Sequence, residues 1–308
     1  MRSLEHRAMK RSFDDWSGTG AAFFNLRGLA LGTILAVSVF AACSSAPKRP
    51  AEISTQRGLV EIQLELGNRE TDRGNYEQAL RLLDEAYRLA VSIDNPALLV
   101  RVELARGNVL SYLDRNGEAQ TAWAAALAEA DRTGETELAA ISRIHIARGR
   151  LLADPETAGE VLDLVQGEMA SVKSDILATA LGWTVTGLAQ KNLGRWAEAE
   201  AALKKSLDIH DRELYLESAA YDWYLIASVR SMAGQYDDAL EALEAALNFD
   251  RRAENTYGLG MDWLALGDVR AKKGDGAAEN AYRRSAAIFR SMNLEAEAAL
   301  AEARLGSP

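Results

Sequence analysis

Few side chains in this 308-residue sequence could take part in catalysis or hold a metal. The histidines His6, His145 and His210 stand far apart, and Cys43 is the only cysteine. Acid–base and metal sites need several such groups converging on one point, and an intramolecular disulfide needs a second cysteine. Metalloprotease, nucleotide-loop, serine-hydrolase and calcium-loop motifs are also absent from the sequence. We therefore expect no catalytic residue, metal or cofactor, and we interpret His145 and His210 as packed or surface residues.

The one reactive group with an informative context is the thiol of Cys43. It follows the uncharged run "GLALGTILAVSVFAA" at residues 28–42, which itself follows Arg27. Fifteen residues are too few for a membrane-spanning helix, which needs ~20, but they suit the core of a secretory signal. We predict a signal peptide at residues 1–42 and a tether at residues 43–54.

The window "FAAC" resembles the bacterial lipobox, whose cysteine receives diacylglycerol and becomes the new amino terminus after cleavage. Ala41, Ala42 and Cys43 match the motif, while Phe40 stands where leucine is usual. The resemblance implies that Cys43 is lipidated with acyl chains such as palmitate, and Ser44 in place of aspartate favours the periplasmic face of the outer membrane. An ordinary cleaved signal, giving a soluble periplasmic protein, and an uncleaved inner-membrane anchor are the alternatives.

The composition favours a helical protein with an acidic surface. Hydrophobic residues make up 48% of the chain and charged residues 26%, and prolines number only 5. β-branched residues seldom cluster beyond the early apolar run, which favours helix over strand. Without residues 1–42, the chain holds 30 basic and 42 acidic residues, a net charge of −12. Such a surface repels phosphate backbones, so we expect no nucleic-acid partner.

Beyond residue 53 the sequence repeats with a step of about 40 residues. The clearest copies are "LGNRETDRGNYEQALRLLDEAYRL" (66–89), "TGLAQKNLGRWAEAEAALKKSLDI" (186–209) and "IASVRSMAGQYDDALEALEAALNF" (226–249). Small residues and tryptophans recur at this step: Gly67, Gly107, Ala147, Gly187, Ala227 and Gly267; Ala79, Ala119, Gly159, Ala199, Ala239 and, offset by one residue, Ala278; Trp183, Trp223 and Trp263. A fixed step of this length is the signature of a stacked repeat protein. The sequence thus predicts an all-α solenoid.

The pattern is similar to the tetratricopeptide repeat (TPR), W-x2-L-G-x2-Y followed by A-x3-F, over about residues 55–291. The usual TPR unit has about 34 residues. The longer unit found here resembles the longer-helix subclass of kinesin light chains and bacterial Rap-type regulators. The resemblance implies about six antiparallel helix pairs and a C-terminal capping helix within residues 55–308. We place the units at about residues 56–95, 96–134, 135–174, 175–212, 213–252 and 253–292, with the cap at 293–305.

Packing and capping give further expectations. Glycine or alanine in the columns of Gly67 and Ala79 would let the two helices of a pair approach closely. Asn95-Pro96 and Asp154-Pro155 each supply an N-cap residue and a first-turn proline. We assign the extra length of the unit to longer first helices, such as residues 213–233.

Bulky residues of the second helix have two expected places. Tyr76, Trp196 and Tyr236 should begin their helices and pack back over the turn. Further along the same helices, one column should point towards the next unit: Leu83, Trp123, Leu203 and Leu243.

The resemblance also implies a partner-binding groove lined by first helices, with these residues in it: Asn68, Asp72, Asn108, Tyr112, Arg148, Tyr221 and Tyr224. Asn68 and Asn108 match the asparagine column of carboxylate-clamp members. The basic residues that complete such a clamp are replaced by Leu64, Glu65, Leu104 and Ala105. A chaperone-type clamp is therefore not expected.

Later units offer a more apolar groove through Tyr221, Tyr224 and Met261, with Ile141, Ile144 and Leu181. The alternative is that about half of these residues belong to the core between units.

These features predict a non-enzymatic scaffold at a Gram-negative envelope that binds an envelope protein or peptide. The TPR resemblance suggests pilus biogenesis, outer-membrane protein assembly or support of cell-wall synthesis. No small-molecule substrate is indicated. The alternative is a soluble or inner-membrane-anchored regulator that binds a signalling peptide, as Rap-type proteins do.

Overall fold

The computed structural model describes residues 51–72 and 75–305, and all regular structure in these ranges is helical. The predicted signal peptide and the lipidation site Cys43 lie outside the described residues. Helix α2 begins at Ala51, so it includes the last four residues that we expected to belong to the tether. In the described part of the chain, no helix is both long enough and apolar enough to cross a membrane.

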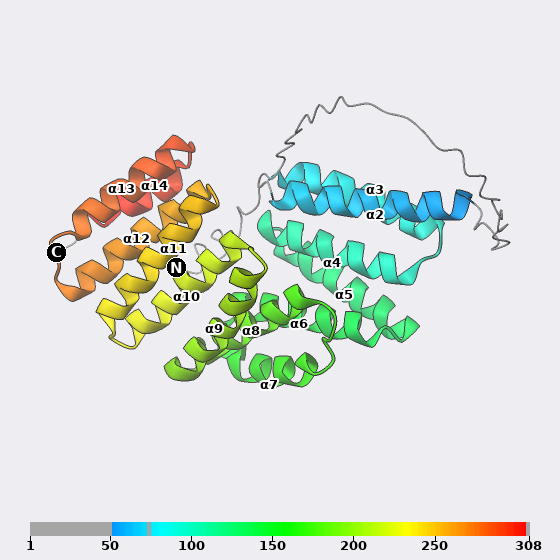
Figure 1. Ribbon diagram of the computed structural model, residues 1–308, viewed down its shortest axis with the longest axis horizontal. Helices are drawn as coiled ribbons and strands as arrows, with labels where there is room; N and C mark the ends of the chain where they lie inside the picture. Colours follow the sequence, from blue (N-terminus) through cyan, green and yellow to red (C-terminus); the bar gives the residue numbers. More distant parts are fainter. Residues whose placement is uncertain (1–50, 73–74, 306–308) are drawn as a thin grey trace, which may run out of the picture.

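The helices form consecutive antiparallel pairs. The first helices of the pairs are α2 (Ala51–Asp72), α4 (Pro96–Tyr112), α6 (Thr136–Ala153), α8 (Ile176–Asn192), α10 (Leu216–Met232) and α12 (Thr256–Lys273). The second helices are α3 (Tyr76–Ser92), α5 (Asn116–Thr133), α7 (Ala158–Met169) after the short η1 (Pro155–Thr157), α9 (Trp196–Arg212), α11 (Tyr236–Arg252) and α13 (Ala278–Ser291), and α14 (Glu295–Ala303) follows. Figure 1 shows the pairs stacked along an arc, with α2 and α3 at one end and α13 and α14 at the other. The prediction of an all-α solenoid is confirmed.

The repeat step of the sequence divides into two equal half-units, each made of one helix and the linker that follows it. Helices α4 and α5, for example, have 17 and 18 residues, and short linkers separate the helices of the regular units. Helices α10 and α11 have the same length, so the expectation of a longer first helix at 213–233 is wrong. In the fifth unit both helices share the extra length, whereas the first helix is the longer one in the first, third and sixth units.

Outside the third unit, the linkers of the described ranges turn through a residue in the left-handed conformation. These residues recur at half-unit spacing: Asp94, Asp114, Gly134, then Gly194, Leu214, Gly234, Glu254, Gly274 and, before α14, Asn293. The residue after each one donates its N–H to a carbonyl five positions earlier, as Tyr215 does to His210 at 2.8 Å. This is the Schellman closure, which satisfies carbonyls at the helix end. The recurring turn fixes the register of the regular units.

Both predicted N-caps are present. Asn95 Oδ1 accepts a hydrogen bond from the Leu98 N–H at 3.1 Å, and Pro96 opens α4. Asp154 Oδ1 accepts from the Glu156 N–H at 3.1 Å, and Pro155 opens η1, which leads into α7. Tyr76, Trp196 and Tyr236 are the first residues of α3, α9 and α11, as expected.

The third unit departs from the regular pattern after α7, which has only 12 residues. Here Glu137 of α6 holds the linker: its carboxylate accepts N–H bonds from Lys173 at 2.7 Å, Ser174 at 2.6 Å and Asp175 at 3.2 Å. These hydrogen bonds lower the pKa of Glu137 to about 2. A buttressing carboxylate thus replaces the left-handed turn at this linker.

Within a pair, a bulky side chain of the second helix packs against the small residue of the first helix that recurs at each repeat step. A Cβ at Gly67 would lie 2.7 Å from Leu83 Cγ, and one at Gly187 would lie 2.6 Å from Leu203 Cγ. Trp123 fills the same place over Gly107. These side chains thus pack within their own pair, and two of them also reach the next unit as expected: Leu83 clusters with Val109 of α4, and Trp123 stacks on His145 of α6. The small column leaves room for a side chain where the helices cross.

Two buried polar pairs join neighbouring units at equivalent positions. Between α9 and α10, His210 Nδ1 lies 2.7 Å from Asp222 Oδ2. One repeat step later, between α11 and α12, Asp250 and Asp262 occupy these positions and hydrogen-bond to each other. Both carboxyls are almost fully buried.

Burial raises the pKa of both carboxyls in the second pair, that of Asp250 to about 7. The Asn255 amide donates to Asp250 Oδ1 at 2.9 Å, and the charge of Arg251 favours ionised Asp262, but neither offsets the desolvation. The pair therefore retains protons that free aspartates would release.

At the C-terminus, α14 covers the last pair. Its Ala298 packs in a cluster with Met261 and Phe289, and its Ala301 packs with Leu264 and Tyr282. The helix lies within the predicted cap at 293–305 and closes the apolar end of the array.

We expect Gly187→Ala to lower the free energy of unfolding by about 1–2 kcal/mol, because its methyl group collides with buried Leu203 and this outweighs the better helix propensity of alanine. Urea unfolding measures the change. The control is Gly167→Ala in α7, where an added Cβ meets nothing within 4 Å and should stabilise by about 0.5–1 kcal/mol. Equal shifts in the two variants would contradict the packing role of the column.

The aspartate pair predicts that stability falls as pH rises. Unfolded aspartates ionise near the ordinary value of 3.8, so from about pH 4 to about pH 7 the folded protein binds more protons than the unfolded chain. Per retained proton, the free energy of unfolding should drop by up to about 1.4 kcal/mol for each pH unit in this window.

Asp262→Asn should flatten this dependence, because its amide can donate to ionised Asp250. Urea unfolding at several pH values compares it with wild type and with Asp237→Asn, whose carboxylate is largely exposed. A slope in Asp262→Asn equal to that of wild type would contradict the assignment.

Candidate partner-binding face

One face of the first helices is accessible to solvent on α4 and α10. On α10 this face carries Tyr221, Tyr224, Ser228 and Met232, spaced by three or four positions so that they share one side of the helix. On α4, three units earlier, the positions in register with Tyr221, Ser228 and Met232 hold Arg101, Asn108 and Tyr112, which are also accessible. We call these seven residues the accessible face.

The two tyrosines of α10 form a flat aromatic surface. The rings of Tyr221 and Tyr224 are stacked, with centroids 6.3 Å apart and planes 12° apart, and both side chains are half-buried. Two rings held against a helix lose little freedom on binding, and they offer both apolar area and polar edges. This pair is the part of the predicted groove that the structure brings together.

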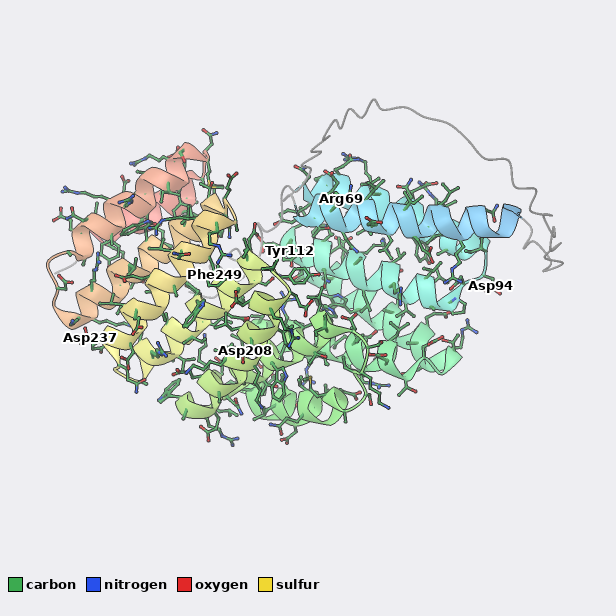
Figure 2. The ribbon with its side chains drawn as sticks, in the orientation of Figure 1. Arg69, Asp94, Tyr112, Asp208, Asp237 and Phe249 are labelled. Carbon is green, nitrogen blue, oxygen red and sulfur yellow. The ribbon has the colours of Figure 1, made fainter. Side chains whose placement is uncertain are left out.

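On α4, Tyr112 is tied to the first pair. Its ring stacks on Tyr76 of α3 with centroids 5.3 Å apart, and Figure 2 places it on the inner side of the arc. The neighbouring Asn108 is half-buried, and within the described residues its Oδ1 is buried without a hydrogen-bond partner. Asn108 is therefore a polar residue of this face whose amide oxygen points inward.

The remaining predicted residues on α2 contribute less. Asn68 is exposed on α2, in the same column as Asn108. Asp72 ends α2, and its side chain lies outside the described part of the structure.

Several predicted groove residues are core residues instead. Arg148 is 5% exposed, and Ile141, Ile144 and Met261 are 4%, 0% and 2% exposed. Met261 is covered by the cluster that α14 completes. The accessible face is thus closed in the third and sixth units, and the alternative that part of the apolar set belongs to the core holds for Ile141, Ile144 and Met261.

The two histidines of the solenoid have structural surroundings. His145 is buried and stacks on Trp123 with ring centroids 5.6 Å apart, and burial together with the charge of Arg148 lowers its pKa to about 3. His210 is held by Asp222. Residues 51–72 and 75–305 hold no cluster of three or more His, Cys, Asp or Glu side chains suited to a metal ion.

Arg101, Ser228 and Met232 belong to the accessible face although we did not predict them. The side chain of Met232 is well exposed, at 49%. Counting three repeat steps forward from Asn108 and Tyr112, or backward from Tyr221, finds all three positions. The repeat step of the sequence was therefore sufficient to predict these three residues.

No protein-family model matches this sequence, and no curated protein matches it. Solved structures do resemble it. A Rap protein complexed with competence and sporulation factor superposes with a TM-score of 0.58 at 16% identity, over 82% of this chain and 76% of that chain.

Two further structures superpose over a similar extent. PilW, described as a widely conserved type IV pilus biogenesis factor, gives a TM-score of 0.53 at 18% identity, over 78% of this chain and 97% of that chain. The apo form of RapI gives 0.51 at 12% identity, over 80% and 96%. The chain therefore has the fold of TPR proteins, an all-helical repeat whose units here are longer than usual.

Proposed function

We propose that this protein is a non-enzymatic scaffold that binds a partner protein or peptide on its accessible face. The observation that carries the proposal is the stacked pair Tyr221 and Tyr224, half-exposed on a first helix whose Ser228 and Met232 are in register with Asn108 and Tyr112. Rigid aromatic rings on an accessible helix face suit the recognition of a peptide. The solved neighbours agree, since the Rap protein was crystallised with a bound factor and PilW is a pilus biogenesis factor.

The partner segment that suits this face carries an apolar or aromatic side chain and a backbone or side-chain donor. The aromatic or apolar group would lie on the tyrosine pair, and the donor would reach a polar side chain of the accessible face such as the partly exposed Ser228. Arg101 and Met232 would border the bound segment on α4 and α10.

The second part of the proposal is attachment to the bacterial envelope through lipidated Cys43, with the scaffold facing the periplasm from the outer membrane. Its support is the window "FAAC" at the end of the apolar run and Ser44 directly after it. Several acyl chains would give lasting attachment, unlike a single chain.

A soluble or inner-membrane-anchored regulator that binds a signalling peptide is the second candidate. It is favoured by the superposition on the Rap protein, whose bound molecule is the competence and sporulation factor. Both candidates use the accessible face and differ in the fate of Cys43.

We expect Tyr221→Ala/Tyr224→Ala to abolish partner capture, because truncating an aromatic anchor in an interface costs about 2 kcal/mol or more. The measurement is crosslinking and affinity capture from envelope extracts with quantitative mass spectrometry. Tyr87→Ala on α3 is the control, since Tyr87 is an exposed tyrosine outside the accessible face. Unchanged capture by the double variant would remove the tyrosine pair from the site.

We expect metabolic labelling with an alkynyl fatty acid to mark the wild-type protein and to leave Cys43→Ser unmarked, because that thiol is the only cysteine available for acylation. Density-gradient fractionation should then move the variant out of the outer-membrane fraction. Circular dichroism checks that the helical content is unchanged. Label on the variant, or none on the wild type, would exclude lipid attachment at Cys43 and leave the soluble or inner-membrane regulator.

A further inference from the structure

A pocket of about 310 Å³ lies between α11 and α12 and shares no residue with the accessible face. It is lined by Glu244, Leu247 and Arg251 of α11 and by Trp263, Leu266 and Arg270 of α12. Leu247 and Leu266 are buried at its floor, and Trp263 is half-buried. The guanidinium of Arg284 lies 4.6 Å from the centroid of the Trp263 ring. The pocket therefore combines an apolar floor, an aromatic wall and two arginines.

The charges of this pocket are poorly neutralised. Within the described residues, Arg251 has no ion-pair partner, and Arg270 reaches only Asp275 Oδ2 at the long distance of 3.9 Å. No ion pair joins Glu244 to either arginine in this part of the chain. On a protein with a net charge of −10, two arginines beside one carboxylate form a local basic site.

The preceding unit shows how the same position is normally neutralised. One repeat step before Arg270 stands Arg230, which donates to Glu200 Oε1 from its Nη2 at 2.8 Å and from its Nε at 3.3 Å. Lys204 Nζ also lies 2.8 Å from this oxygen. The pocket wall is repeated there too, with Trp223 in the place of Trp263.

The residue in register with Glu200 in the last regular unit is Leu240. The array thus keeps the arginine and the tryptophan from one unit to the next, while Leu240 replaces Glu200 and Glu244 replaces Lys204. Arg270 stands in register with Arg230 but has no carboxylate in the position of Glu200, and its ion-pair partner Asp275 Oδ2 is 3.9 Å away.

We infer that this pocket is a second binding site, for a glutamate or aspartate side chain on an acidic segment of a partner polypeptide. The partner's carboxylate occupies the place beside Arg270 that Glu200 occupies beside Arg230, and Arg251 provides a second cation. The aliphatic part of the side chain packs on Leu247, Leu266 and the Trp263 ring. A planar guanidinium matches a carboxylate in two hydrogen bonds, which gives such a site its preference.

The test uses a fluorescein-labelled hexaglutamate peptide and the full chain, with fluorescence anisotropy at low ionic strength. Wild type should bind saturably, and Arg270→Ala should weaken binding by about tenfold or more, because it removes one partner of a desolvated charge pair. Arg283→Ala is the matched control: it removes the same charge from an exposed arginine that is paired with Glu279.

Exchanging the residues of the two units makes the test reciprocal. Leu240→Glu should also weaken binding by about tenfold or more, because it supplies an internal carboxylate and keeps both arginines. Glu200→Leu should instead raise the number of bound peptides, because it frees Arg230 and Lys204. Thermal unfolding verifies that each variant is folded. If Leu240→Glu does not fold, the comparison of Arg270→Ala with Arg283→Ala tests the proposal.

Equal affinities of Arg270→Ala and Arg283→Ala would overturn the proposal, since binding would then follow net charge alone. Inorganic phosphate that binds more tightly than the peptide would overturn the assignment to a carboxylate. Tyr221→Ala/Tyr224→Ala should bind hexaglutamate as wild type does, so failure of this site and failure of the accessible face are distinguishable.

Discussion

The left-handed turn that ends each half-unit is the constraint on which the rest of this structure depends. It stops each regular helix at nearly the same length, closes the free carbonyls and reverses the chain. Because the turn recurs in every half-unit of the regular units, residues one repeat step apart face equivalent neighbours in successive units. The helix crossings, the polar pairs between units and the accessible face therefore all recur at positions one or more repeat steps apart.

The sequence predicts the array well because its signals are local and repeated. Each of these signals determines a single helix end or a single helix crossing. The structure has the glycine and alanine columns, the N-caps and the aromatic residues that begin helices at the expected positions. The sequence does not predict the half-unit spacing of the turns, because Leu214 and Glu254 adopt the left-handed conformation although neither is a glycine. At such positions the surrounding packing outweighs a local cost of about 1–2 kcal/mol.

Exposure along the first helices could be predicted only in part. Tyr221 and Arg148 both come from the columns assigned to the groove, yet the first is half-exposed and the second is buried. Column position gives the direction of a side chain, whereas its exposure depends on what the neighbouring units place over it. Met261 illustrates the point, because α14 belongs to no repeat and still covers it.

Differences between successive units carry the specific properties of this protein, because the shared features only build the array. At one pair of equivalent positions, His210 and Asp222 form a hydrogen bond, while Asp250 and Asp262 retain protons that free aspartates would release. At another, Glu200 neutralises Arg230, while Leu240 leaves Arg270 open. Both changes fall at the boundary between the fifth and sixth units. A stacked repeat tolerates such changes because each unit contacts mainly its neighbours, so one boundary can take on binding and pH-dependent properties while the register of the others is kept.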